Sequence, residues 1–185
     1  MKIDCNIDGK NYSFSVNSDK PLIQILIDDI EVESMMSICK GAFCGNCIVM
    51  IDGQAALSCL IPAFKMNGAT IQTFESFRKT RAFRDIDRAY NEVGCTPCRQ
   101  CYASKTMIIE SIIQTIEKQQ SLLSNPVERN RLRRSSEIEE IQAEQDQFAI
   151  RELSLNSCTC TEDSELVKVV KACLEYRRRR NVRRS

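Results

Sequence analysis

The chain has 185 residues, of which 28% are charged, and its formal net charge is +1. This length suits one ordinary domain or two small ones, and the near-neutral charge gives no general reason to expect nucleic acid or a membrane surface as a partner. The sequence contains no histidine, which removes the usual general base and most zinc catalysis.

The cysteines of the chain point to metal ligation. There are eleven of them, an odd number, and they cluster in short gaps instead of spreading like a disulfide framework. The first residues interleave charges and lack an apolar signal core, and no uninterrupted apolar run is long enough to span a bilayer. We therefore expect a cytoplasmic protein without membrane insertion.

Residues 1–30 predict a β-hairpin followed by a helix. Apolar residues alternate with polar ones on either side of the turn Asp8-Gly9: Ile3, Cys5 and Ile7 precede it, and Tyr12, Phe14 and Val16 follow it. From Pro21 the spacing becomes helical, with apolar residues at Leu22, Ile25, Leu26 and Ile30. This helix leads toward a cysteine-rich loop.

Three cysteines crowd that loop, and a fourth comes shortly after it. Four residues separate Cys39 from Cys44, two separate Cys44 from Cys47, and Cys59 comes after eleven more. This is the plant-type ferredoxin spacing for a 2Fe-2S cluster, whose irons take cysteine ligands. Zinc sites more often repeat two-residue gaps or mix cysteine with histidine, so the spacing favours the iron–sulfur cluster.

Two glycines in the same loop, Gly41 and Gly45, support this interpretation. Glycine permits the irregular backbone that turns N–H groups toward a buried cluster, so both are cofactor-binding candidates. Beyond the loop, Ile48–Ile51 predict a short buried strand and Thr70–Phe74 a closing strand. This order of elements is that of a small mixed sheet folded over one helix, and we expect the α+β class.

Helical spacing replaces the strand pattern near residue 77. One predicted helix ends at Gly94, and a long one follows Cys101. The stretch from about 119 to 156 is polar and predicts an excursion from the core that contains a helix opened by Ser136 and Glu139. A last helix starts near Glu162, and residues 177–185 form an Arg-rich tail without the aromatic residues that nucleic-acid binding favours.

A second group of cysteines lies at the ends of these helices. Cys98 and Cys101 are separated by two residues, and Cys158 and Cys160 by one. Four helices could bring the two pairs together, although a zinc site or a redox-active dithiol would also use the first spacing. Cys95 forms a further two-residue gap with Cys98 and is an alternative ligand.

Taken in this order, the two cysteine groups resemble those of the small iron–sulfur subunit of the xanthine dehydrogenase and carbon monoxide dehydrogenase (molybdenum hydroxylase) family. The resemblance covers residues 1 to about 110 and about 155 to 175. It assigns one ligand set to Cys39, Cys44, Cys47 and Cys59, and a second to Cys98, Cys101, Cys158 and Cys160, with Asn156 and Thr161 flanking the last pair as in the family.

The resemblance implies a beta-grasp 2Fe-2S ferredoxin-like domain at residues 1–76 and an all-α, four-helix-type 2Fe-2S domain at residues 77–185. It also implies that electrons leave a molybdopterin centre on a large partner subunit, pass through two 2Fe-2S clusters and continue to an FAD-binding subunit. On this view the chain is the electron-transfer subunit of an oxidoreductase and carries no catalytic residue for an organic substrate.

The sequence departs from the family pattern at both sites. The first loop has Ala42 where the family usually has glycine, and the segment Pro97–Ser104 differs from the motif that faces the molybdopterin. These departures motivate a second hypothesis, in which only the first cluster is kept. The helical part is then a structural or zinc-stapled docking module for a non-molybdenum oxidoreductase.

Overall fold

The structure is a computed structural model, and it describes residues 1–17, 19–35, 44–122 and 135–182. The first part of the chain forms β1 (Lys2–Ile7), β2 (Lys10–Ser15), α1 (Leu22–Asp28), β3 (Ile48–Ile51), β4 (Gln54–Leu57), two 3₁₀ turns, η1 (Ser58–Leu60) and η2 (Ala63–Met66), and β5 (Thr70–Gln72). The second part forms α2 (Phe74–Phe77), α3 (Arg81–Val93), α4 (Tyr102–Leu122), α6 (Ser135–Leu153) and α7 (Asp163–Val182). The α+β class is therefore confirmed.

The strands form one five-stranded mixed sheet in the order β2-β1-β5-β3-β4. The predicted hairpin is confirmed, since β1 pairs antiparallel with β2 and the turn residues Asp8 and Gly9 have φ values of 53° and 82°. Strand β5 runs parallel to β1 and antiparallel to β3. The helix α1 packs on this sheet, and their shared core contains Ile3, Ile7, Leu22, Ile25, Leu26, Val49 and Ile71.

Two predicted boundaries differ from the structure. Helix α1 ends at Asp28, so Ile30 lies beyond it. The closing strand ends at Gln72, because the next residue, Thr73, is held by Asp8: the Thr73 N–H donates to Oδ1 at 2.8 Å and its hydroxyl to Oδ2 at 2.7 Å. The chain then turns into α2 at Phe74.

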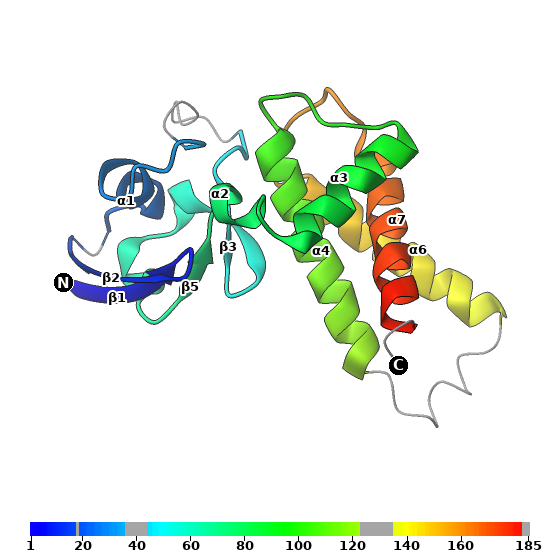
Figure 1. Cartoon of the computed structure of the whole chain (residues 1–185), viewed down its shortest axis with the longest axis horizontal. Helices are drawn as coiled ribbons and strands as arrows, with labels where there is room; N and C mark the ends of the chain where they lie inside the picture. Colours follow the sequence, from blue (N-terminus) through cyan, green and yellow to red (C-terminus); the bar gives the residue numbers. More distant parts are fainter. Residues whose placement is uncertain (18, 36–43, 123–134, 183–185) are drawn as a thin grey trace.

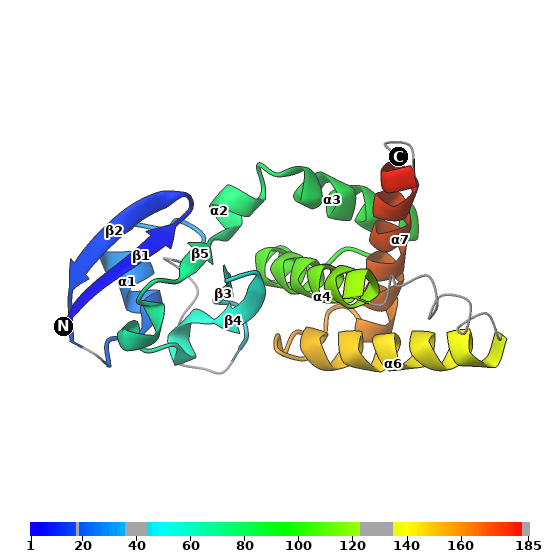
Figure 2. The same cartoon turned by 90° about the horizontal axis from the view of Figure 1, so that it is seen from below.

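Helices α3, α4, α6 and α7 pack around a second core at the other end of the molecule (Figures 1 and 2). Helix α3 ends where predicted, with Gly94 in the left-handed conformation at φ 71°. The isoleucines of α4 are buried, as their spacing predicts. None of the described helices is both long and apolar enough to cross a membrane.

The polar stretch from about 119 to 156 is less separate from the core than we expected. In α6, Ala149 and Leu153 are 1% and 0% exposed and belong to the helical core, while Ile150 is 43% exposed. The two buried residues lie four apart and share one face of the helix, which suffices to dock it despite its sparse apolar residues. The stretch expected to be a basic tail also differs, since α7 continues to Val182 and buries Arg177.

Strand β3 joins the two cores. Its residues alternate, so that Ile48 and Met50 face the helical core while Val49 faces α1. Next to it, the N–H of Ala55 in β4 donates to the hydroxyl of Ser111 in α4 at 2.9 Å. The sheet and the helices are thus in direct contact along β3 and β4, and the two cysteine-bearing regions are held on one framework.

Candidate metal centre

Three of the four cysteines predicted for the second site lie together. The sulfur atoms of Cys98, Cys158 and Cys160 are all within 4.8 Å of one another, and those of Cys98 and Cys158 are 3.8 Å apart. Cys98 precedes α4, and the other two lie in the connection between α6 and α7. Such a group of thiols can hold a thiophilic metal ion or cluster.

Cys101 lies beside this group. Its backbone N–H donates to the carbonyl of Cys98 at 2.9 Å in the turn that opens α4, and its side chain is 6% exposed. Cys95 is not a member of the three-sulfur group. Burial, and to a smaller extent the negative charge of the nearby Glu165, raises the pKa of its thiol. The described geometry therefore favours Cys98 over Cys95 as the first ligand.

The thiols of this site differ in acidity. The backbone N–H of Cys101 and the neighbouring thiols outweigh burial and lower the pKa of Cys98 to about 7. Burial, with the neighbouring Cys158 and Cys98, raises the pKa of Cys101 to about 12. Hydrogen bonds with Cys158 and Cys98 raise the pKa of Cys160 to about 11. The Cys98 thiolate thus forms near neutral pH, and a bound metal must displace the protons from Cys101 and Cys160.

A buried lysine fastens the segment that carries Cys158 and Cys160. Lys105 in α4 is 1% exposed, and its Nζ donates to the carbonyl of Leu153 at 2.8 Å and to Oδ1 of Asp163 at 2.6 Å. Leu153 is the last residue of α6 and Asp163 the first of α7, so Lys105 holds both ends of the segment between these helices. Lys105 was not predicted as a site residue, although a lysine among the apolar residues of this helix is a signal in itself.

The described part of the first site is less compact. Cys47 is buried at the start of β3, Cys44 is half-buried before it, and Cys59 lies in η1. The backbone N–H and the hydroxyl of Ser58 both donate to the carbonyl of Cys47, at 3.0 and 2.8 Å. These bonds bring the turn that contains Cys59 beside the first loop. Among the residues that the structure describes, these three thiols do not form a group as tight as that of the second site. The predicted site residues Cys39 and Gly41 lie outside the described residues.

The two cysteine-bearing loops meet. The backbone N–H and the hydroxyl of Ser157 both donate to the carbonyl of Cys44, each at 3.2 Å, although the two residues are 113 positions apart in the sequence. Gly45 has φ +75°, and a Cβ built there would lie 2.1 Å from the carbonyl oxygen of Leu155. Gly45 is thus required for the close approach of the two loops, a role beyond the one predicted for it.

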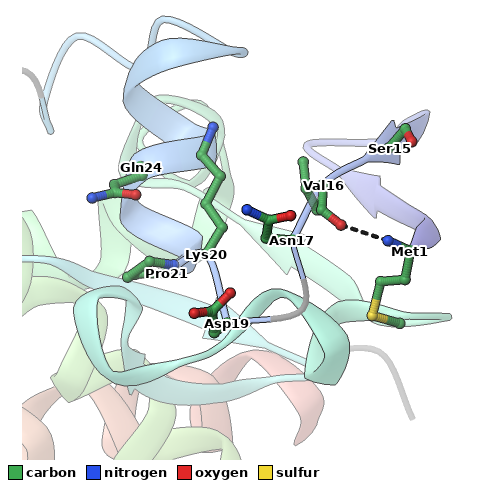
Figure 3. A pocket seen from close by; sticks show the side chains of 8 residues that line it. All are labelled: Met1, Ser15, Val16, Asn17, Asp19, Lys20, Pro21 and Gln24. Carbon is green, nitrogen blue, oxygen red and sulfur yellow. Dashed lines mark hydrogen bonds between the residues drawn. The ribbon is translucent and has the colours of Figure 1, made fainter.

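An open groove elsewhere on the molecule is not part of this centre. It lies between the end of β2 and the start of α1 and is lined by Met1, Ser15, Val16, Asn17, Asp19, Lys20, Pro21 and Gln24 (Figure 3). No cysteine lines it.

The fold and the site define a mixed α+β protein with a group of three cysteine thiols that could hold a metal. No family model matches the chain. One of the subunits of nicotinate dehydrogenase from Pseudomonas putida is 25% identical over 177 residues, which are 96% of this chain and 97% of that protein. The xanthine dehydrogenase iron-sulfur-binding subunit from Escherichia coli is 30% identical over 101 residues, which are 55% of this chain and 63% of that protein.

A solved structure shares the fold. The crystal structure of quinoline 2-oxidoreductase from Pseudomonas putida superimposes with a TM-score of 0.64 at 23% identity, covering 97% of this chain and 96% of the matched one. The chain is therefore related to the iron–sulfur small subunits of the molybdenum hydroxylase family, and the predicted resemblance is confirmed. The thiol group and these relatives support an iron–sulfur cofactor.

Proposed function

We propose that this chain is the electron-transfer iron–sulfur subunit of a multi-subunit, xanthine dehydrogenase-like oxidoreductase in the cytoplasm. The grouping of the three thiols of Cys98, Cys158 and Cys160 within 4.8 Å carries the proposal, and the similarity to a protein named as an iron-sulfur-binding subunit supports it. In this role the chain lies between a large molybdopterin-binding subunit and an FAD-binding subunit. It binds no organic substrate itself.

The first 2Fe-2S site is assigned to Cys39, Cys44, Cys47 and Cys59. Their spacing is that of plant-type ferredoxins, and the bonds from Ser58 to Cys47 place the last of them beside the loop. We assign this site to a beta-grasp domain at residues 1–76.

The second 2Fe-2S site is assigned to Cys98, Cys101, Cys158 and Cys160, in a four-helix domain at residues 77–185. When bound, each cluster supplies a one-electron carrier whose potential depends on hydrogen bonds and exposure. The chain's own contribution is to hold the thiolates: the N–H of Cys101 favours the thiolate form of Cys98, and Lys105 closes the segment that carries Cys158 and Cys160.

One observation favours a second candidate function. With Zn–S bonds of about 2.3 Å, the sulfur atoms of a tetrahedral zinc site lie about 3.8 Å apart. Cys98 and Cys158 have this separation, and all three thiols lie within 4.8 Å of one another, close enough for a single ion, whereas a 2Fe-2S cluster divides its cysteines between two irons. In this alternative the helical part is a zinc-stapled docking module, and the chain carries one cluster.

Metal and acid-labile sulfide analysis, combined with low-temperature EPR of the reduced protein, separates the two functions. We expect about four iron atoms and four sulfides per chain and two distinct EPR signals. About two irons with one zinc would favour the docking module, and zinc without iron would contradict both.

A further inference from the structure

A buried amide lies between the two cysteine-bearing loops. Asn156 is 2% exposed, and its Nδ2 lies 3.1 Å from the carbonyl oxygen of Gly45, 2.7 Å from Oδ1 of Asn46 and 3.0 Å from Oγ of Ser104. Gly45 and Asn46 belong to the first loop, and Ser104 to the first turn of α4. One side chain therefore joins three segments that are distant in the sequence.

The orientation of this amide follows from its partners. Oδ1 of Asn156 accepts from the backbone N–H of Cys158 at 3.1 Å, and an N–H can only donate. The Nδ2 group must then face the other side, where the carbonyl of Gly45 can only accept. The bond to the residue two positions on also makes this an Asx turn, which shapes the backbone at Cys158.

Each partner of Asn156 adjoins another predicted ligand. Asn46 directly precedes Cys47, and the hydroxyl of Ser104 lies 3.1 Å from the carbonyl of Cys101. The same hydroxyl lies 3.2 Å from Oδ1 of Asn46. A displacement of the Asn156 amide would therefore move residues next to both predicted ligand sets.

Burial makes this network costly to break. Asn46 and Ser104 are 8% and 2% exposed, so little water can replace a lost hydrogen bond. Buried polar groups are stable when they satisfy one another, and removal of one member leaves the others unpaired.

We propose that Asn156 is a positioning residue that fixes the two cysteine sites relative to each other and shapes the backbone at Cys158. The consequence for clusters rests on the proposed function, while the link between the loops does not. Electron exchange between two centres depends on their separation and orientation, and the potential of each depends on the hydrogen bonds around its sulfurs. Asn156 acts on both through the chain and touches no reacting atom.

Three substitutions in the full chain isolate this role. Asn156→Ala removes all the bonds, whereas Asn156→Asp keeps the size and the acceptor for Cys158 but loses the N–H donors. Ser154→Ala is the matched control, because Ser154 is exposed and its hydroxyl donates to the carbonyl of Arg151 at the end of α6.

The readouts are iron content, the two reduction potentials and the magnetic splitting between the two centres in the EPR spectrum of the reduced protein. We expect both Asn156 variants to keep about four irons but to change the splitting, and Asn156→Ala to shift the potential of the second centre. Ser154→Ala should match the wild type. Wild-type splitting and potentials in Asn156→Ala would overturn the proposal.

A double-mutant cycle between Asn46→Ala and Asn156→Ala tests the link between the loops whatever the chain binds. We expect each single substitution to lower the Tm by about 2–8 °C and the double substitution to lower it by clearly less than the sum. Additive shifts would overturn the proposal. Fewer than about four irons in the wild type would instead contradict the two-cluster function. The double-mutant cycle would then still test whether Asn156 links the two loops.

Discussion

Gly45 is the residue at which the two loops leave no room for a side chain. It has φ +75°, and an added Cβ would lie 2.1 Å from the carbonyl oxygen of Leu155 and 2.4 Å from Cα of Asn156. We expect Gly45→Ala to lower the free energy of unfolding by about 2–5 kcal/mol, from left-handed strain and overpacking together. Urea unfolding measures the loss.

Gly68→Ala is the control for this prediction. Gly68 has a similar φ of +77° but nothing within 4 Å of an added Cβ, so only the left-handed strain of about 1–2 kcal/mol applies. Equal losses in the two variants would show that the approach of the loops does not constrain Gly45.

Lys105 offers a second test at this scale. Lys105→Met keeps most of the buried volume but leaves Asp163 and the carbonyl of Leu153 without their cation. We expect a loss of about 2–4 kcal/mol in urea unfolding, less than for a fully buried pair because the Asp163 side chain is 26% exposed. In the control Lys168→Met, the lysine is 60% exposed and pairs with Glu165, and the change should stay within about 0.5 kcal/mol. Similar losses would contradict the role given to Lys105.

The sequence predicts the candidate ligands better than the residues that hold them. Cys98, Cys158 and Cys160 could be proposed because ligand spacing is a local pattern. Lys105 stands out in its apolar helix, but its partners and those of Asn46 could not be predicted, because they lie 48 to 110 residues away and only the folded chain brings them together. The position of Asn156 beside Cys158 was visible, but not its contact with the first loop.

At the scale of the elements, Arg177 joins α7 to α4. Its guanidinium donates to Glu110 at 2.5 Å and to Glu117 at 3.0 Å, and Arg177 and Glu110 are 6% and 2% exposed. We expect Arg177→Met to lower the free energy of unfolding by about 3–5 kcal/mol, because Glu110 is left as an unpaired buried charge. The exposed pair of Arg179 with Glu175 is the control, and Arg179→Met should change stability by less than about 1 kcal/mol.

Helix α2 is tied to the segment that precedes the first loop. Oε1 of Glu75 accepts from the N–H of Ser34 at 2.7 Å, and although burial opposes ionisation, the hydrogen bonds from Ser34 lower the pKa of this carboxyl. A carboxyl with a lowered pKa in the folded state stabilises the fold above its unfolded pKa of about 4.3, and this contribution is lost as the pH falls below that value.

Glu75→Gln should therefore be less stable than the wild type at pH 7, with a difference that shrinks as the pH falls below about 4.3. Urea midpoints measured between about pH 3 and 7 check this, with the exposed Glu140→Gln as the control. A difference that stays constant over this range would contradict the role of the ionised carboxylate.

Element prediction succeeded where local patterns decide and failed where tertiary contacts do. The hairpin at Asp8-Gly9 and the end of α3 at Gly94 follow from turn and cap chemistry. The end of β5 depends on the bond of Thr73 to Asp8, 65 residues away. The docking of α6 rests on Ala149 and Leu153. Two apolar residues in a polar stretch are too weak a pattern to predict that the helix joins the core.

At the scale of the whole molecule, the two cores share β3 and the two cysteine loops share the buried amide of Asn156. This arrangement suits the proposed function, in which one subunit holds two iron–sulfur centres at a constant separation. The proposed function requires that the thiols of the helical part hold a second iron–sulfur cluster.

Iron content after substitution of one second-site cysteine tests this requirement. In Cys158→Ala we expect about half of the wild-type iron and sulfide and the loss of one EPR signal, because Cys39, Cys44, Cys47 and Cys59 still hold the other cluster. Cys173→Ala, which changes a buried cysteine of α7 outside the three-thiol group, should keep the full content. Unchanged iron in Cys158→Ala would contradict a second cluster on these thiols.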